Sequence, residues 1–396
     1  MKTAYKLHGV HRHYDWGGTK YIPSLLGIEN PSQKPFAEYW MGAHLSAPAT
    51  VETTEGNMSL AQWVEQEGTT ILGNKVYQQF GSLPYLYKVL DVAKMLSIQV
   101  HPTKENALIG FEKEEAAGIA LDAANRNYKD KNHKPEVMVA LSDFWLLHGF
   151  LAPDMLASRL QSFSCFHALV PYFEGANYLG LYQHFMSLSA QDADAILKPL
   201  MEEAVASVNS GLVDKSHPHW WAYKYYNGVV PTQNIDKGIF SIYILNIVFV
   251  PKYAGIFQGA GLLHAYLEGQ NIELMANSDN VLRGGLTPKH VDIKELLAHV
   301  HFAPTYPNVL MGDALNSFET NYPCPVADFG LSKIQLKAGA AYTILPSTIE
   351  MLLVVEGTVS IGTELFNRGE VALLVAGKEV ELSSTAGALL FRSFAP

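Results

Sequence analysis

The chain has 396 residues and a formal net charge of −10, which argues against a nucleic-acid partner because phosphate backbones bind basic surfaces. Hydrophobic residues make up 48% and charged residues 17%, a globular composition without a signature of disorder, and the length allows two or three domains. No apolar run reaches membrane length, and the N-terminal residues lack the apolar core of a signal peptide. We therefore expect a cytoplasmic protein without a membrane partner.

The first half of the chain predicts buried strands followed by helices. Residues 84–100 are rich in β-branched and aromatic residues and predict two buried strands. Residues 104–120 carry Glu and Ala at a density that favours a helix, and residues 136–140 predict a further strand. From about residue 153 to residue 213, apolar residues recur at helical spacing, which predicts a long helical segment.

The second half of the chain predicts mainly strands. The apolar run 239–250 predicts strand structure that ends at Pro251. Residues 351–361 predict two strands joined by a turn at Glu356 and Gly357, and later runs continue the same rhythm. Short strands separated by glycine turns indicate a double-sheet jelly roll.

Side chains from distant segments predict a metal site. Gln99 and His101 are two residues apart, so both point to the same face of a strand, and Glu136 and His264 can complete a shell of nitrogen and oxygen ligands. The only two cysteines form no C-x-x-C pair. This excludes a cysteine-built zinc module or a disulfide framework and favours a reducing compartment.

Five segments, in order along the chain, resemble type I mannose-6-phosphate isomerases. These segments are 14–17, 37–44, 88–102, 130–136 and 254–291. The resemblance implies a zinc-dependent cupin enzyme that interconverts D-mannose 6-phosphate and D-fructose 6-phosphate, an aldose-ketose isomerase with one Zn²⁺ per chain. It also implies that Gln99, His101, Glu136 and His264 are the zinc ligands and that Arg283 is an active-site cation.

Three positions depart from what is usual in that family. Thr103 follows the His-Pro pair where Asp or Asn is frequent, and Leu263 precedes His-Ala-Tyr where Pro is usual. His148 stands where a cysteine is common. None of these positions is a proposed ligand, so the departures concern substrate preference and loop geometry.

Moving a carbonyl between two sugar carbons requires a base that transfers a proton and a charge that stabilises the enediol or enediolate intermediate. Glu273 is the first candidate base, because it follows His264 on the same strand-like run. Lys134 is the second candidate, because it precedes Glu136 by two residues and would face the same cavity in an extended segment.

The phosphosugar that we expect as the small-molecule partner also requires cations. Arg283 suits an anionic intermediate or a phosphate, because a guanidinium group binds oxyanions in a fixed fork. Ser97, Lys88 and Lys134 are further candidates for the phosphate pocket.

Two other classes of function remain open at this point. One is a metal-binding or sugar-binding cupin without catalysis, since a fold alone does not fix a function. The other is an iron-dependent cupin oxygenase, although a glutamine ligand with only two histidines fits zinc isomerase chemistry better.

We predict a mainly β fold with a helical insertion, that is, two cupin-like jelly rolls plus an α-helical domain. Residues 1–150 and 228–303 are expected to form the catalytic cupin domain, interrupted by a helical insertion at 151–227. Residues 304–396 are expected to form a second jelly roll, and this copy is interpreted as structural because its final seventy or so residues contain no histidine.

Overall fold

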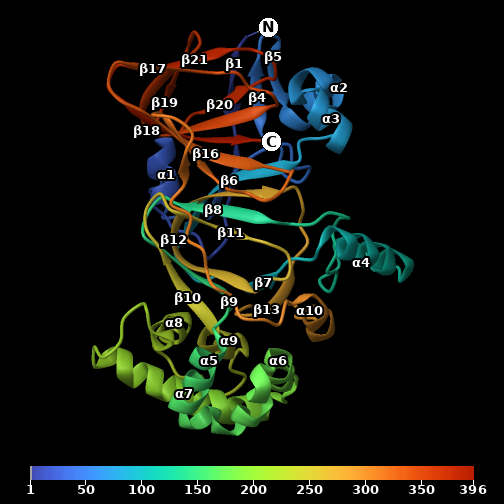
Figure 1. Cartoon of the computed structure of the whole chain (residues 1–396), viewed down its shortest axis with the longest axis vertical. Helices are drawn as coiled ribbons and strands as arrows, with labels where there is room; N and C mark the ends of the chain where they lie inside the picture. The colour runs from blue at the N-terminus through green and yellow to red at the C-terminus, as the bar shows by residue number, and fades with distance from the viewer. Residues whose placement is uncertain (1) are drawn as a thin grey trace.

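A computed structural model describes residues 2–396. Within that range, the strands form a 12-stranded sheet and a 10-stranded sheet. Figure 1 shows three layers along the long axis: the 12-stranded sheet at the top, the 10-stranded sheet in the middle, and helices at the bottom. We call these layers the C-terminal sheet, the middle sheet and the helical layer.

The middle sheet combines strands from before and after the helical layer. Its order is β10-β9-β12-β6-β3-β2, while β7 and β8 also pair with β12, β13 pairs with β7, and β11 pairs with β8. The strands are β2 (Val10–Arg12), β3 (Glu38–Met41), β6 (Tyr85–Val92), β7 (Ile98–Val100), β8 (Glu136–Ala140), β9 (Phe144–Phe150), β10 (Leu245–Val250), β11 (Gly255–Gln258), β12 (His264–Ala276) and β13 (Leu282–Gly285). The long strand β12 therefore connects segments that are far apart in the sequence.

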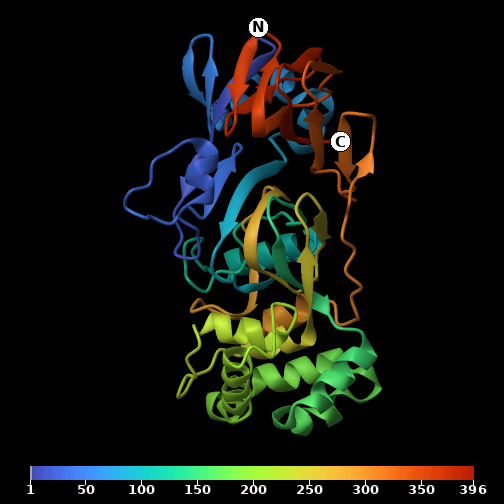
Figure 2. The same ribbon diagram turned by 90° about the vertical axis from the view of Figure 1, so that its left-hand side faces the viewer.

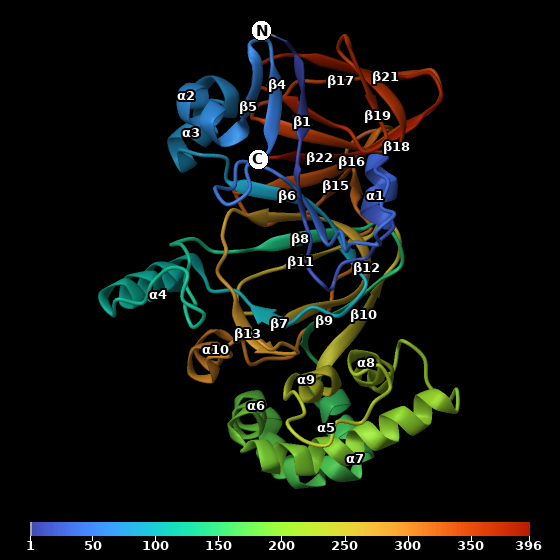
Figure 3. The ribbon, with the colours of Figure 1, turned by 180° about the vertical axis from the view of Figure 1, so that it is seen from behind.

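The C-terminal sheet also contains the N-terminal strand. Its order is β14-β15-β16-β22-β18-β20-β1-β4-β5, with β17, β19 and β21 paired beside this path. The strands are β1 (Ala4–His8), β4 (Thr50–Thr53), β5 (Gly56–Ser59), β14 (Asp313–Ala314), β15 (Glu319–Tyr322), β16 (Gly330–Leu336), β17 (Ala340–Ile344), β18 (Glu350–Ile361), β19 (Glu364–Asn367), β20 (Val371–Leu374), β21 (Val380–Ser384) and β22 (Ala388–Phe394). Figure 3 shows β1 and β4 side by side in this layer.

Most helices lie in the helical layer, and the others flank the two sheets. The helical layer holds α5 (Pro153–Ser162), η1 (Ser164–Ala176), α6 (Tyr178–Ser187), α7 (Ala190–Asn209), α8 (Pro218–Tyr225) and α9 (Gly238–Ile244). The flanking helices are α1 (Tyr21–Leu26), α2 (Leu60–Leu72), α3 (Asn74–Phe80), α4 (Lys104–Ala116) and α10 (Ile293–His299). None of the helices in residues 2–396 combines the length and apolar composition needed to cross a bilayer.

The predicted fold class is confirmed: the chain is mainly β with a helical insertion. The strands expected in 84–100 and 136–140 form β6, β7 and β8, and the expected helix after residue 104 forms α4. The long helical segment begins as predicted at Pro153, and its longest helix, α7, starts where Ser189 caps the backbone N–H of Asp192.

The prediction of strand structure throughout 239–250 is wrong in its first half. Residues Gly238–Ile244 form α9, and only Leu245–Val250 form a strand, β10. Every residue of α9 is buried, so its sequence is apolar on all sides and carries no period that separates a helix from a strand. The contacts of α9 with neighbouring helices and with β13, and not a sequence pattern, determine that this segment is helical.

The predicted turn at Glu356 and Gly357 is also absent. One strand, β18, runs from Glu350 to Ile361, and its register against β22 shifts between Val354 and Glu356. Gly357 has φ 78°, and an added Cβ would lie 2.2 Å from the carbonyl oxygen of Gly387. The register shift places a β-bulge at Val355, two residues before this glycine, so a bulged strand followed by a glycine gives the same sequence signal as a hairpin.

The connection between the middle and C-terminal sheets runs along one side of the molecule. Figure 2 shows this extended segment, in orange, passing from the level of the helical layer to the C-terminal sheet. Buried side chains fill the space between the two sheets and, separately, the space between the middle sheet and the helical layer. The middle sheet is thereby held on two sides, which favours a rigid site on its strands.

Candidate metal centre and active site

Three predicted ligands meet in the interior of the middle sheet. Glu136 at the start of β8 lies between His101 and His264, with its Oε1 3.4 Å from His101 Nε2 and its Oε2 3.4 Å from His264 Nε2. Their candidate ligand atoms all lie within 4.8 Å of one another, and all three residues are buried. Strands β7 and β8 both pair with β12, and His101 directly follows β7. These contacts bring together residues that the whole helical layer separates in the sequence.

The second ring nitrogen of each histidine is held by a backbone carbonyl. Nδ1 of His101 donates to the oxygen of Asn280 at 2.8 Å, and Nδ1 of His264 donates to the oxygen of Leu262 at 2.9 Å. A carbonyl only accepts hydrogen bonds, so both protons sit on Nδ1 and both Nε2 lone pairs face the carboxylate. His101 Nε2 is buried and makes no hydrogen bond within residues 2–396. This orphaned nitrogen, with a second imidazole and a carboxylate, fits a zinc ion.

Gln99 and Arg283 are placed beside this group by strand register. On β7, Gln99 lies directly opposite His264 of β12 on one side and opposite Arg283 of β13 on the other. Directly opposed residues of antiparallel strands project to the same face, so these residues share one surface. The Gln99 amide also donates a long hydrogen bond of 3.5 Å to the hydroxyl of Ser97.

A buried ion pair lies beside the metal group. Nζ of Lys88 on β6 is 3.0 Å from Oε2 of Glu273 on β12, and the two residues are cross-strand partners. Nζ of Lys134 lies 3.2 Å from Oε1 of Glu136, as expected for an extended segment, whereas His133 points away and contacts Asp328 at 3.0 Å. Lys88, Lys134 and Glu273 are each less than 10% exposed.

Burial and neighbouring charges set the protonation of these groups. Burial opposes the charge of Glu136, but Lys134 and His101 outweigh it and hold the pKa of Glu136 well below its usual range. Burial, reinforced by Lys134, lowers the pKa of His101 to about 4, so its ring is neutral at pH 7. Burial raises the pKa of Glu273, while Glu273 overcomes the effect of burial on Lys88 and raises the pKa of that lysine. The raised pKa of Glu273 is closer to neutral pH than the pKa of an exposed carboxylate, which suits a base.

A group of cations lies around Arg283. Burial lowers the pKa of Arg283, and no carboxylate of residues 2–396 offsets this effect. Lys129 and Lys289 are close enough to Arg283 for its charge to lower the pKa of each, after the larger effect of burial. Glu114 and Asp122 partly offset the charge of Lys129, but no carboxylate opposes Arg283 or Lys289, and such unopposed like charges favour an anionic ligand. The sequence analysis named Arg283 but assigned no role to Lys129 or to Lys289, although Lys289 lies in the segment 254–291 that resembles the isomerase family.

The turn that follows Arg283 is fixed from the helical layer. One carboxylate oxygen of Asp236 accepts the backbone N–H groups of Gly238 and Leu286, at 2.7 and 2.8 Å, and the other accepts that of Thr287 at 2.9 Å. This carboxylate therefore joins the start of α9 to the end of β13. Its role was missed because it depends on a contact between segments fifty residues apart.

Asn280, to which the sequence analysis assigned no role, holds the loops around the metal group. The Asn280 side chain donates to the carbonyl oxygens of Asp130 and Asn132, both at 2.8 Å, and accepts the backbone N–H of Lys129 at 2.7 Å. Asn280 is fully buried. This network ties the segment before β8 to the segment before β13, and it aims the carbonyl that binds His101.

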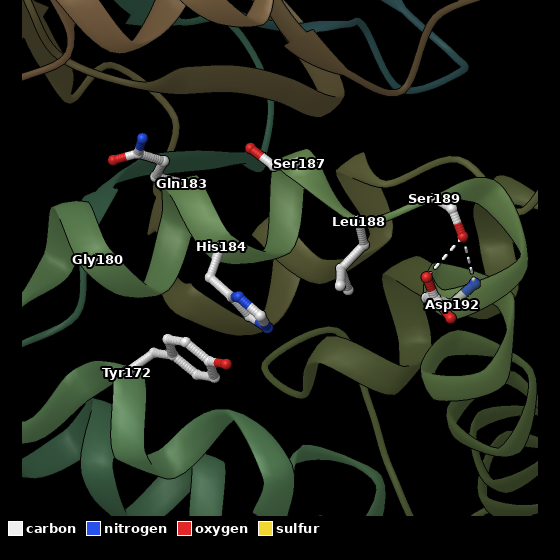
Figure 4. A pocket seen from close by; sticks show the side chains of 8 residues that line it. All are labelled: Tyr172, Gly180, Gln183, His184, Ser187, Leu188, Ser189 and Asp192. Carbon is white, nitrogen blue, oxygen red and sulfur yellow. Dashed lines mark hydrogen bonds between the residues drawn. The ribbon is translucent and has the colours of Figure 1, made fainter.

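A separate groove lies in the helical layer and contains none of the predicted site residues. It has a volume of about 530 Å³ and is lined by Tyr172, Gly180, Gln183, His184, Ser187, Leu188, Ser189 and Asp192. Figure 4 shows the ring of Tyr172 stacked on His184 and Ser189 capping the first turn of α7. Tyr172 contacts His184 and Ser189 bonds Asp192, whereas the predicted ligands and the predicted base lie on or beside the strands of the middle sheet.

Comparisons with known proteins agree with this site. Residues 4–152 match the family model of the phosphomannose isomerase type I catalytic domain. The chain is 38% identical to mannose-6-phosphate isomerase of Escherichia coli strain K12, over 89% of this chain and 88% of that protein. It is 41% identical to the enzyme of Salmonella typhimurium, over 83% and 82% of the two chains. A solved structure of the Salmonella typhimurium enzyme, bound to its substrate and to zinc, covers all of both chains with 35% identity and a TM-score of 0.87.

These similarities extend over both sheets and the helical layer. They include the strands that bring His101, Glu136 and His264 together. The chain belongs to the type I phosphomannose isomerase family.

Proposed function

We propose that this protein interconverts D-mannose 6-phosphate and D-fructose 6-phosphate through an enediol or enediolate intermediate. The observation that carries the proposal is the buried Lys88–Glu273 ion pair, 3.0 Å long, set beside the His101–Glu136–His264 group. A base shielded from water next to a metal group is the arrangement that proton transfer between adjacent sugar carbons requires. It also disfavours a cupin that binds a metal or sugar without catalysis.

The zinc ligands in this proposal are Gln99, His101, Glu136 and His264. Their support is the orphaned Nε2 of His101, the carboxylate that bridges the two imidazoles, and the register that sets Gln99 opposite His264. A zinc ion held by these residues would supply positive charge that stabilises developing negative charge, either as a Lewis acid on the sugar oxygens or through its bound water.

Glu273 is the proposed base, with Lys88 and Lys134 as its cationic neighbours. Because burial raises its pKa, Glu273 accepts a proton from one sugar carbon more readily than an exposed carboxylate would. Its ion pair with Lys88 keeps it ionised before the reaction and orients one of its oxygens. Because Lys88 is paired with the proposed base, we place Lys88 near the reacting carbons of the sugar and not in the phosphate pocket.

Arg283 is the proposed phosphate-binding residue, supported by Lys289 and Lys129. Arg283 and Lys289 act on each other without an opposing carboxylate, whereas Glu114 and Asp122 also act on Lys129. Ser97 stays a candidate for the same pocket, because its hydroxyl lies beside Gln99 and next to the strand pair β7–β13.

The domain boundaries and the location stay proposals as well. We propose that 1–150 and 228–303 form the catalytic domain around the insertion 151–227, since β6 to β9 all pair with β12 and β7 also pairs with β13. The exception is β1, which pairs with β20 of 304–396 and is followed in the same sheet by β4 and β5. A cytoplasmic location is supported by two cysteines that are both free thiols.

The test is conversion of mannose 6-phosphate to fructose 6-phosphate by the purified protein, before chelation, after exhaustive chelation, and after zinc is returned. We expect activity to be lost and then regained. A folded protein with bound zinc that does not interconvert these sugars would refute the proposed function.

A further inference from the structure

Lys88, which pairs with the proposed base, also contacts a tryptophan. Trp40 on β3 and Glu273 on β12 both lie directly opposite Lys88 of β6, the strand between them in the middle sheet. Directly opposed residues of antiparallel strands project to the same face, so the three side chains form one row. Nζ of Lys88 lies 5.1 Å from the centre of the Trp40 ring and 3.0 Å from Oε2 of Glu273. The ammonium group therefore contacts an aromatic ring as well as the carboxylate.

The ring of Trp40 attracts this ammonium group. A cation within about 6 Å of an aromatic ring centre is attracted by the negative face of the ring, and tryptophan is the strongest partner. The attraction is larger where water is excluded, and Trp40 and Lys88 are only 7% and 6% exposed. A lysine side chain rotates about several bonds, so a second contact beside the ion pair restrains its ammonium group.

A second carboxylate competes for Lys88. Burial opposes the charge of Lys88, but Glu273 and then Glu38 outweigh burial and raise the pKa of the lysine. Glu38 is itself 8% exposed, and its Oε2 accepts a hydrogen bond from the indole Nε1 of Trp40. This bond occupies one oxygen of the competing carboxylate. Trp40 thus favours the pairing of Lys88 with Glu273 in two ways.

The position of Trp40 is set by contacts other than Lys88. Cζ of Arg12, on β2, lies 5.0 Å from the centre of the Trp40 ring, and the ring of His44 packs edge-on against it at 5.2 Å between centres. A ring held in this way keeps its own place when Lys88 moves. It can therefore serve as a fixed support for the lysine.

We propose that Trp40 is a positioning residue that holds the ammonium group of Lys88 against the carboxylate of Glu273. The inference rests on the proposed function, because it assigns Glu273 the role of base. A base must be oriented to within about 0.5 Å to act on a carbon-bound proton, and Lys88 fixes one oxygen of Glu273. Trp40 should therefore affect kcat more than KM.

The variants Trp40→Leu and Trp40→Phe test this proposal by steady-state kinetics. We expect Trp40→Leu to lower kcat by about tenfold, the scale of a cation–π contact shielded from water, with KM changed less than about twofold. Trp40→Phe keeps an aromatic face and should retain more of the parental kcat. In the Lys88→Met background, Trp40→Leu should cause little further loss, because its effect passes through the lysine that is already gone. Trp220→Leu, at a half-buried position of α8, is the matched control and should leave kcat and KM unchanged.

Fluorinated tryptophans at position 40 separate the attraction of the ring from its packing. Each added fluorine weakens the negative face of the ring while nearly keeping its shape, so kcat should fall stepwise along the series. A kcat that does not change along the series would mean that Trp40 only fills space, and it would overturn the proposal. This series also decides the question if Trp40→Leu does not fold.

A crystal structure of zinc-free Trp40→Leu gives a readout that does not depend on activity. Nζ of Lys88 should lie beyond hydrogen-bond distance of Glu273 in it. An unchanged Lys88–Glu273 bond, or additive losses in the double variant, would contradict the positioning role. If the parent protein does not interconvert the two sugars, the proposed function fails, whereas this structure still decides whether Trp40 holds Lys88.

Discussion

The backbone oxygen of Asn280 accepts a hydrogen bond from Nδ1 of His101 at 2.8 Å and so turns Nε2 of that histidine toward Glu136. The side chain of Asn280 fixes this carbonyl by bonding the loop that leads to Glu136. The ligand and its supporting loop are thus oriented by one buried residue. Residues that orient a metal ligand through a hydrogen bond commonly change the metal affinity by a factor of about 10 to 100.

We predict that Asn280→Ala weakens zinc binding by about 10- to 100-fold. The carbonyl survives the substitution, but the loop that aims it loses the side-chain hydrogen bonds to Asp130 and Asn132. Competition with a chelator of known affinity measures the change. Asn57→Ala, at an exposed position of β5, is the control. Parental zinc affinity in the Asn280 variant would show that the loop is held by other contacts.

For the proposed base, Glu273→Gln should lower kcat by about 10²- to 10⁴-fold while zinc stays bound, since the amide keeps the shape of the side chain but cannot accept the proton. The measurements are steady-state kinetics, metal content and the exchange of substrate hydrogen with deuterated solvent. Glu381→Gln, exposed on β21, is the control. Near-normal turnover by the Glu273 variant would transfer the role of base to Lys134.

Much of the site could be predicted from the sequence because its residues lie in short segments. A spacing of two residues predicted that Gln99 and His101 share one face of a strand, although β7 ends at Val100 and His101 follows it. One strand-like run correctly contained both His264 and Glu273. These inferences require only the geometry of a single strand. The structure adds the pairing that sets Gln99 opposite His264.

The parts that could not be predicted depend on contacts between distant segments. The conformation of α9 is decided by its burial, because its residues show no period. The carbonyl of Asn280 and the hydroxyl of Tyr266 find their partners only when the sheets assemble. Arg392 is a similar case, since its sequence neighbours give no sign that two buried carboxylates will surround it.

Replacing Arg283 by Met should raise KM for mannose 6-phosphate by about 10- to 100-fold, the scale of a charge-assisted hydrogen bond, with a smaller effect on kcat. The test compares mannose 6-phosphate with mannose as the substrate, because only the phosphorylated sugar should lose affinity. Lys337→Met, exposed beyond β16, is the control. An equal loss for both sugars would assign Arg283 to the reacting carbons instead of the phosphate.

The stability of the protein should depend on pH through Glu268, which joins β12 to the helical layer by ion pairs with Lys215 and Lys224. Burial opposes its charge, but the two lysines outweigh burial and lower the pKa of Glu268. Because the folded value lies below the unfolded value of about 4.3, the stabilisation is complete above that pH and is lost as the pH falls through the folded pKa.

Accordingly, Glu268→Gln should lower the free energy of unfolding by about 0.5 to 1 kcal/mol at pH 7, a small value because the pair is partly exposed to solvent. The difference from the parent protein should shrink as the pH falls below about 4.3 and through the lowered folded pKa. Urea unfolding of both proteins over this range measures it. Loss of zinc in acid affects both proteins alike, so only the difference between them bears on Glu268, and a difference that stays constant with pH would contradict the assignment.

The strongest effect on stability is expected from the C-terminal sheet, where Arg392 on β22 binds Glu350 through two hydrogen bonds, at 2.7 and 2.8 Å, and Glu319 at 2.9 Å. Both carboxylates are almost fully buried, and burial raises the pKa of Glu350 even with the arginine present.

Arg392→Met would leave two adjacent buried carboxylates without a cation, which should cost about 3 to 5 kcal/mol in the free energy of unfolding. Adding Glu350→Gln should recover part of that loss, since one of the unpaired charges is removed. Urea unfolding measures both variants, and kcat at 25 °C should stay close to the parental value because this group lies outside the middle sheet. A loss below about 1 kcal/mol would mean that water reaches the two carboxylates and solvates them.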